Sequence, residues 1–316
     1  MRKHLPNKPH EGINLDYEQV PCPICGSTAP KPLFRDINRR DGLQVDGIYS
    51  RCSTCDMVYL SFRPLWPDII NLETEAHAIH PADVGPAPPR SFLKQWVVDQ
   101  LILGPHRWPL GDAKPGQKLL DIGCGSGSKL LEFSRRGWEV YGVDINPRAI
   151  EKARQTVPQG HFFCAELTHL PPRANSFDFI RIDNCLEHVP NPVSMIEKCF
   201  ELLKSGGKTY ICVPNANSFS FKFMKKFSIH AWIPFHLNMF TETTLRNLLL
   251  TAGFSKVEIN TFTPIDYLPL SLEQMFTKPP TSARARYRMF IPFLLPLSLA
   301  VQLLGLGEEL VAVGTK

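Results

Sequence analysis

The sequence predicts an α/β protein with an open sheet of parallel strands, preceded by a small metal-binding ribbon. Two observations predict the sheet: an apolar strand runs into a glycine-rich turn at 123–127, and the next apolar strand ends in Asp144. Strand–turn–helix units of this kind assemble into parallel sheets. A third observation predicts the ribbon, because two Cys-x-x-Cys pairs lie within the first 63 residues.

Composition places the chain among ordinary globular proteins. Its 316 residues allow about two domains. The 43% of apolar and 21% of charged residues exclude disordered and collagen-like classes. A net charge of +5, spread along the chain, tolerates a phosphate-bearing partner without requiring one. The segment 1–6 lacks the apolar run of a signal peptide, so we expect a cytoplasmic protein.

Four cysteines stand at metal-ligand spacing: Cys22, Cys25, Cys52 and Cys55. In a reducing compartment two such pairs predict one tetrahedral Zn²⁺ site. Segment 1–63 has few long apolar runs and needs another source of stability. A structural zinc ion is therefore favoured over a zinc ribbon that binds nucleic acid. We therefore expect a zinc ribbon at 1–63, a linker with a leading helix (92–103) at 64–115, and the main domain at 116–316.

In the main domain, apolar runs predict strands over 117–122, 138–144, 177–183 and 208–214. The glycine turn after the first strand brings backbone N–H groups and a helix N-terminus to a ligand, and Asp144 suits the two hydroxyls of a ribose. A nicotinamide dinucleotide fits in outline. However, the turn is shorter than the dinucleotide motif and follows Asp121, which favours a ligand with a cationic amine over a pyrophosphate.

Five ordered motifs between about 117 and 262 resemble those of class I S-adenosylmethionine-dependent methyltransferases. They are Leu119–Gly127, Val143–Pro147, Ser176–Ile180, Cys185–Pro192 and Leu203–Lys208. The resemblance implies a Rossmann-like, seven-stranded, doubly wound sheet in which the strand expected over 309–315 runs antiparallel. The intervening segment 264–306 is then an insertion.

The resemblance also implies a cofactor site for S-adenosylmethionine. Asp121 and the turn would hold the methionine moiety, Asp144 would bind the ribose, and Glu166 would accept from the adenine amino group. The complete set expected to bind the cofactor is Asp121, Gly123, Cys124, Gly125, Gly127, Asp144, Ile145, Glu166, Leu167, Asp183 and Asn184.

Two histidines compete for the role of base in methyl transfer to a hydroxyl, since imidazole is best matched to neutral pH. His188 follows the fourth strand, and His236 lies in a His-x-x-x-Phe-Thr segment before the helix expected over 242–254. Each histidine also has a purely structural interpretation. His188 could cap the next helix, and His236 could hold in place the loop before the helix expected over 242–254.

The acceptor is expected to be a small molecule with a hydroxyl or carbon nucleophile: a sugar, a nucleotide sugar or a lipid-linked glycan. Lys222, Lys225 and Lys226 alternate with aromatics and suggest a lid over phosphate or sugar, or an amphipathic helix. An RNA methyltransferase is the first alternative, which the mild charge disfavours. A non-catalytic module that binds S-adenosylmethionine or a partner is the second.

The insertion contains an uncharged stretch, 289–306, that follows Arg284, Arg286 and Arg288. Two prolines and a length near the lower limit argue against a bilayer span. Three interpretations stay open: a helical hairpin packed on the core, a homodimer interface, or a peripheral membrane contact through 284–306 that suits a lipid-linked acceptor.

Overall fold

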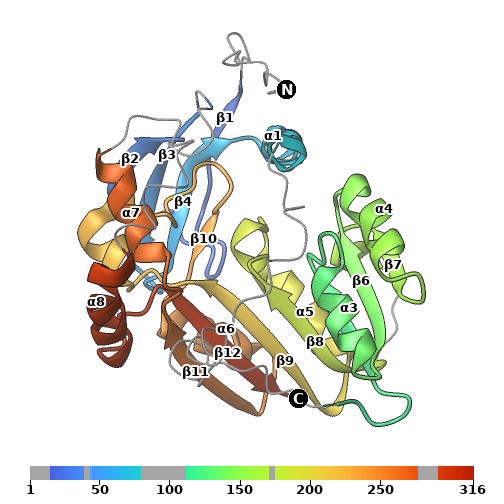
Figure 1. Ribbon diagram of the computed structural model, residues 1–316. Coiled ribbons are helices and arrows are strands. Elements are labelled where there is room, and N and C mark those ends of the chain that lie inside the picture. The colour runs from blue at the N-terminus through green and yellow to red at the C-terminus, as the bar shows by residue number, and fades with distance from the viewer. Residues whose placement is uncertain (1–14, 39–42, 44, 80–111, 171–174, 277–290) are drawn as a thin grey trace, which may run out of the picture.

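Two β-sheets lie side by side in the computed structural model (Figure 1). The structure describes residues 15–38, 43, 45–79, 112–170, 175–276 and 291–316. The helix expected over 92–103 and the three arginines of the insertion lie outside the described residues.

The smaller sheet contains the first four strands, β1 to β4, in the order β1-β4-β3-β2. Their bounds are Tyr17–Gln19, Pro30–Ile37, Asp46–Cys52 and Val58–Pro64. The two cysteine pairs lie at the turns after β1 and β3. A fifth strand, β10 (Asn238–Met239), comes from far along the chain and pairs with β4.

The larger sheet has seven strands in the order β11-β12-β9-β8-β5-β6-β7, which confirms the predicted doubly wound fold. Both ladders of β12 (Glu309–Thr315) are antiparallel, and the other pairings are parallel. The remaining strands are β5 (Lys118–Ile122), β6 (Glu139–Asp144), β7 (His161–Cys164), β8 (Phe177–Asp183), β9 (Leu203–Pro214) and β11 (Lys256–Phe262).

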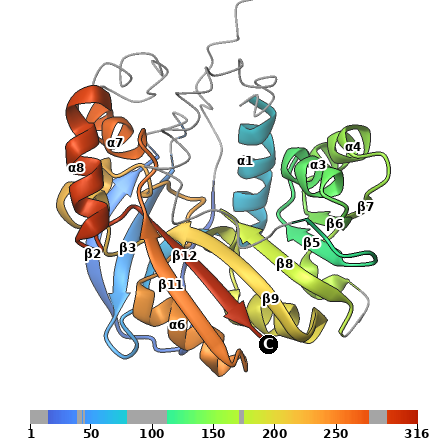
Figure 2. The same ribbon diagram turned by 60° about the horizontal axis from the view of Figure 1, so that its bottom comes forward.

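Helices cover both faces of the larger sheet (Figure 2). Successive residues of a strand point to opposite faces. Leu119 accordingly packs in the core under α3 (Ser128–Arg135) and α4 (Pro147–Thr156), whereas Leu120 packs under α5 (Pro192–Leu202) and α6 (Glu242–Thr251). Continuously apolar strands are therefore required, and the sequence supplies them.

Three further helices lie outside this scaffold. α1 (Trp66–Ile79) follows the small sheet and was not predicted, since its segment was assigned to a linker. α7 (Tyr267–Phe276) and α8 (Ile291–Leu303) occupy the apolar insertion and contact each other. Both leave apolar side chains exposed, and α8 is too short to cross a bilayer, as is every other helix of the described chain.

The two sheets are joined by the segment 236–239. The Leu60 amide of β4 donates to the Leu237 carbonyl at 2.9 Å, and the Tyr49 hydroxyl of β3 donates to the His236 carbonyl at 2.8 Å. Met57, directly before β4, also belongs to the same apolar core as Ile122 of β5. The described residues between 15 and 64 are thus packed against the larger sheet and form part of one unit with it.

Replacement of Tyr49 by Phe is expected to lower the free energy of unfolding by about 1 kcal/mol, because the buried His236 carbonyl loses a donor. Tyr59→Phe is the matched control. Tyr59 is equally buried, but its hydroxyl makes no hydrogen bond among the described residues. Urea unfolding measures both variants, and equal losses of stability would contradict the assigned role of the Tyr49 hydroxyl.

Candidate active site

A cavity of about 1100 Å³ opens at the carboxyl ends of β5, β6 and β8. This edge is where open α/β sheets bind ligands. Its walls come from the glycine turn, the loops after β6, β7 and β8, helix α1, and the segment 229–236. Residues predicted to bind the cofactor and the two histidines predicted to act as base therefore line the same cavity. They are Gly123, Gly125, Asp144, Ile145, Glu166, Leu167, Asn184, His188 and His236.

The glycine turn is held in shape by Asp144. One carboxylate oxygen accepts from the Gly125 amide at 2.9 Å, and the other accepts from the Asn146 amide at 2.8 Å. Gly123 and Gly125 have positive φ angles of 71° and 51°, which L side chains rarely adopt. A Cβ at Gly123 would also lie 2.8 Å from the Cys185 sulfur. The turn therefore needs glycine for both conformation and space.

Four of the expected cofactor residues do not line the cavity. Cys124 is buried and would crowd any side chain at Gly142, while Gly127 lies against Ala153 at the start of α3. Asp121 and Asp183 share the guanidinium of Arg181, whose Nη1 lies 2.7 Å from an Asp121 oxygen.

The buried ion pair changes what Asp121 can do. Its carboxylate is fully buried, and burial raises its pKa to about 6 although Arg181 lowers it. Both of its oxygens accept from Arg181 rather than facing the cavity. Asp121 of β5 and Asp183 of β8 thus share an ion-pair partner within the sheet, Arg181 of β8, and the contact of Asp121 with a cationic amine stays a prediction.

The two predicted histidines lie together at the other end of the cavity. Their rings pack edge to face with centroids 4.9 Å apart, although His188 follows β8 and His236 precedes β10. Nδ1 of His188 lies 3.3 Å from a carboxylate oxygen of Glu73, and Trp232 packs on both rings. Glu73 was missed because α1 was not predicted.

Hydrogen bonding determines the tautomer of His236. Its Nδ1 lies 2.9 Å from the carbonyl oxygen of His230, which can only accept. Nδ1 therefore carries a proton, and in the neutral ring Nε2 has the lone pair. A lone pair at Nε2 is what a proton acceptor or a metal ligand requires.

Glu187 is a cavity residue that the sequence analysis passed over, although it lies beside His188 in the quoted motif. Its side chain is 0% exposed, and neither carboxylate oxygen has a hydrogen-bond partner in the described part of the chain. Burial raises its pKa well above the usual value. One ligand atom each from Glu187, His188 and His236 lies within 4.8 Å of the other two.

Carboxylates gather at the histidine end of the cavity, where Glu309 and Asp266 join Glu73 and Glu187. Among the described lining residues the Lys and Arg side chains are Arg148 and Lys152, both on α4 beside the glycine turn. The three lysines suggested as a lid do not line the cavity, and their segment forms two short helical turns, Ser220–Met224 and Lys225–Phe227, in place of a long helix.

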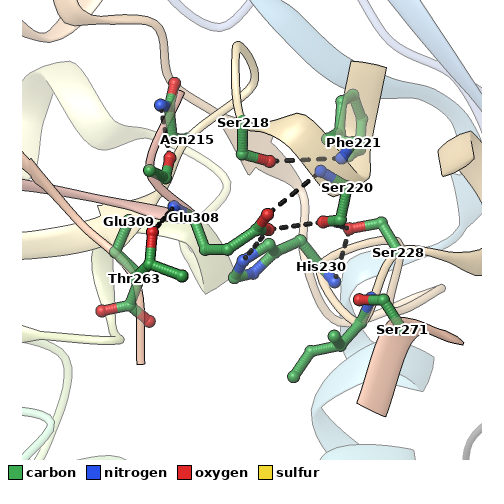
Figure 3. A network of polar contacts seen from close by, with 12 residues as sticks. Asn215, Ser218, Ser220, Phe221, Ser228, His230, Thr263, Ser271, Glu308 and Glu309 are labelled. Carbon is green, nitrogen blue, oxygen red and sulfur yellow. Dashed lines mark hydrogen bonds and ion pairs between the residues drawn. The ribbon is translucent and has the colours of Figure 1, made fainter. Parts of the chain in front are cut away.

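Behind the cavity, a polar network connects the start of β12 to the segment 218–236, which carries His230 and His236 (Figure 3). Glu308 accepts from the Ser220 amide at 3.0 Å and lies 3.4 Å from Nε2 of His230. The Ser220 and Ser228 hydroxyls bond each other at 2.7 Å. Because the His230 carbonyl binds His236, this network sets the position of the second histidine.

The four ribbon cysteines converge as predicted. Cys22 and Cys55 sulfurs lie 3.5 Å apart, Cys25 and Cys52 sulfurs lie 3.6 Å apart, and all four sulfurs fall within 4.8 Å of one another. Tetrahedral zinc with bonds of about 2.3 Å requires sulfur separations of about 3.8 Å. The cluster therefore fits a metal ion of that kind.

Comparisons with known proteins point to one family. A family model described as a methyltransferase domain matches residues 61–259, more than half of the chain. A solved structure of phosphoethanolamine N-methyltransferase 2 from Haemonchus contortus with S-adenosyl-L-methionine is 17% identical and covers 82% of this chain and 63% of its own, with a TM-score of 0.50. At that identity the likeness shows the fold alone.

Two curated relatives are ubiquinone biosynthesis O-methyltransferases. The protein of Acinetobacter baylyi is 32% identical over 114 residues, which are 34% of this chain and 48% of the relative. That of Coxiella burnetii is 35% identical over 106 residues, 32% of this chain and 45% of the relative. The chain spans about half the length of the curated relatives it matches.

Replacement of Asp144 by Ala is expected to weaken S-adenosylmethionine binding about 10- to 100-fold, since hydrogen bonds to a charged group contribute about 1.5–3 kcal/mol. The variant also frees the Gly125 and Asn146 amides. Calorimetric titration with S-adenosylmethionine and S-adenosylhomocysteine measures the loss. Asp178→Asn, at the opposite end of β8, is the control; equal affinities for all three proteins would contradict the assignment.

Replacement of Glu309 by Gln is expected to stabilise the protein increasingly as pH rises. Burial raises the pKa of Glu309 above its ordinary 4.5, so the folded state holds a proton that the unfolded chain releases. The stability from this residue is complete at low pH and declines above about pH 4.5. Glutamine does not titrate.

The difference in unfolding free energy between Glu309→Gln and the wild type should widen from pH 5 to pH 8, by at most about 1.4 kcal/mol per pH unit. Denaturant unfolding at several pH values measures it. Glu151→Gln, on the exposed side of α4, serves as the control. A constant difference across this range would refute the assignment.

Proposed function

The chain belongs to the methyltransferase domain family, and on that premise we propose that it transfers the methyl group of S-adenosylmethionine to a hydroxyl oxygen of a small molecule. One observation carries this proposal: two histidines share a cavity with the glycine turn and Asp144. A carbon nucleophile is the alternative acceptor. The printed names of the curated relatives, which are O-methyltransferases, support oxygen.

In the proposed complex the cofactor lies along the glycine turn. The Gly123 and Gly125 backbone would face the methionine carboxylate, and Asp144 the ribose hydroxyls. The adenine would lie between Ile145 and Leu167, near Glu166, and Asn184 would face the sulfonium end. Asp121 and Asp183 would act through Arg181, by holding the ends of adjacent strands in place.

The proposed reaction is a direct displacement. The acceptor oxygen attacks the methyl carbon, the carbon–sulfur bond breaks with its electron pair going to sulfur, and S-adenosylhomocysteine leaves. The hydroxyl proton goes to Nε2 of His236 or to His188. Holding the two reactants in line and away from water supplies most of the rate. The hydrogen bond at Nδ1 of His236 favours its Nε2 as an acceptor.

The charge distribution of the cavity limits which molecules could be the methyl acceptor. Its histidine end bears carboxylates, and the two described basic lining residues lie on α4. An uncharged polyol such as a sugar ring fits this end, and Trp66, Trp232 and Tyr267 offer it apolar faces. The phosphates of a nucleotide sugar or a lipid-linked glycan would have to remain outside the carboxylate-lined end.

We further propose that the cysteine cluster holds Zn²⁺ in a structural role. The sulfur separations fit the ion, and the small sheet supports the segment 236–239, which begins with His236, through β4 and Tyr49. A ribbon that supports the segment 236–239 beside the cavity would have this structural role without binding nucleic acid. The packing thus supports the structural interpretation over an RNA-binding ribbon.

The apolar insertion supports a peripheral membrane contact of a cytoplasmic protein. Phe276 of α7 and Phe293 of α8 are 77% and 80% exposed, and Leu303 is 88% exposed. Exposed apolar side chains on neighbouring helices favour burial in a lipid surface. Such a contact would bring a lipid-linked acceptor to the cavity. A homodimer through the same helices is the alternative.

The test is methyl transfer from S-adenosylmethionine with a labelled methyl group to neutral sugars, nucleotide sugars and lipid-linked sugars. Incorporation at oxygen, located by mass spectrometry, is the expected result. His188→Gln or His236→Gln should reduce kcat about 100- to 10,000-fold if the residue is the base, with little change in cofactor affinity.

His161→Gln is the control. His161 lies in β7, the edge strand of the large sheet, and its ring stacks on Tyr141 of β6. Transfer to carbon, or full activity in both cavity variants, would overturn the proposed chemistry.

A further inference from the structure

We propose that Glu187, His188 and His236 form a binding site for a divalent metal ion inside the cavity, separate from the cysteine cluster, at which the acceptor hydroxyl is held. The site deepens the proposed function and rests on it for the role of the acceptor. The metal site itself is argued from the three side chains and their neighbours.

The donor set suits a first-row divalent ion. One carboxylate and two imidazoles on one side of a metal leave the remaining positions open to other ligands. The ligand atoms lie within 4.8 Å of one another, and ligands of one ion lie about 3–3.5 Å apart at bonds of about 2.1 Å. Side-chain rotations that move each atom by about an ångström bring them into place.

Glu187 supplies an independent observation. It is completely buried, it lines the cavity, and its two oxygens accept no hydrogen bond within the described chain. A buried polar group without a partner costs about 1–3 kcal/mol and calls for an explanation. A cation at this position would satisfy both oxygens.

The surroundings prepare both imidazoles as ligands. Metal-bound histidines usually give their other N–H to a carboxylate or a backbone carbonyl, which fixes the tautomer. Here the His230 carbonyl oxygen lies 2.9 Å from Nδ1 of His236 as a hydrogen-bond partner. Glu73 lies 3.3 Å from Nδ1 of His188, a distance that allows an ion pair but not a hydrogen bond in the present geometry. Nε2 of His188 points the other way, 3.9 Å from a Glu187 oxygen.

The backbone holds the ligands in one frame. The Leu237 amide donates to the Glu187 carbonyl at 2.8 Å, so the two ligand segments are bonded directly. The Asn238 side chain donates to the Val189 carbonyl at 2.6 Å, on the far side of His188. A site with this support does not need to be assembled by the ion.

A bound metal changes the proposed chemistry. The acceptor oxygen would bind the ion, which lowers the pKa of the hydroxyl, and a neighbouring hydroxyl of a diol can occupy a second open position. The hydroxyl proton leaves to solvent, the oxygen attacks the methyl carbon, and the carbon–sulfur electron pair goes to sulfur. The two histidines then act as ligands, and neither is the base.

Mn²⁺ is the probe, because it prefers oxygen and nitrogen donors whereas the four thiolates prefer zinc. Zinc is measured first in each full-length protein; one ion per chain in the wild type and variants shows that the cysteine cluster is intact. Mn²⁺ is then titrated while the free ion is followed by electron paramagnetic resonance. The wild type is expected to bind one Mn²⁺, and Glu187→Gln and His236→Gln to bind it at least tenfold more weakly.

Glu309→Gln is the matched control, as it removes another buried cavity carboxylate that is not a proposed ligand, and it should bind Mn²⁺ as the wild type does. S-adenosylhomocysteine affinity, measured by calorimetry, reports folding of each variant. If the folded wild type binds no Mn²⁺ at millimolar concentration, or if Glu187→Gln binds it equally well, the metal site is refuted. If the wild type transfers methyl groups but binds no Mn²⁺, the metal site is refuted while the proposed methyl transfer, with a histidine as the base, still holds.

Discussion

One peptide segment links the small sheet to the loop that follows β8 of the large sheet. The Leu237 carbonyl accepts from β4 of the small sheet, while its amide donates to the Glu187 carbonyl in the loop after β8. A single residue is thus hydrogen-bonded to both halves of the fold, and His236 precedes it directly. Because β10 continues this contact as a strand of the small sheet, displacement of that sheet would move the histidine relative to the cofactor turn.

The strands and the glycine turn were predictable because local patterns specify them. Continuous apolar runs identify strands buried on both faces, and the turn at 123–127 demands glycine by its own backbone geometry. The cysteine cluster also followed from spacing, since two tight turns bring four thiolates to one point. These features depend on neighbours within a few residues.

The features that could not be predicted depend on pairing over long distances. Asp121 is paired with Arg181 because the parallel register places the two residues side by side on β5 and β8, although they are 60 positions apart in sequence. β10 has two residues and no periodicity to detect. Glu73 reaches His188 only because α1 returns to the cavity, which is a consequence of packing.

The buried acids behind and within the cavity differ in how their burial is compensated. Glu308 has the Ser220 amide and hydroxyl and the ring of His230 around it, and Glu309 accepts from the Cys212 thiol at 2.7 Å. These contacts satisfy the carboxylate of Glu308, whereas Oε1 of Glu309 has no hydrogen-bond partner among the described residues. Glu187 has no hydrogen-bond donor of this kind in the described chain and faces the cavity. The fold thus pairs both oxygens of Glu308 and one oxygen of Glu309, whereas both oxygens of Glu187 are without a hydrogen-bond partner among the described residues, and a ligand that binds there would explain this difference.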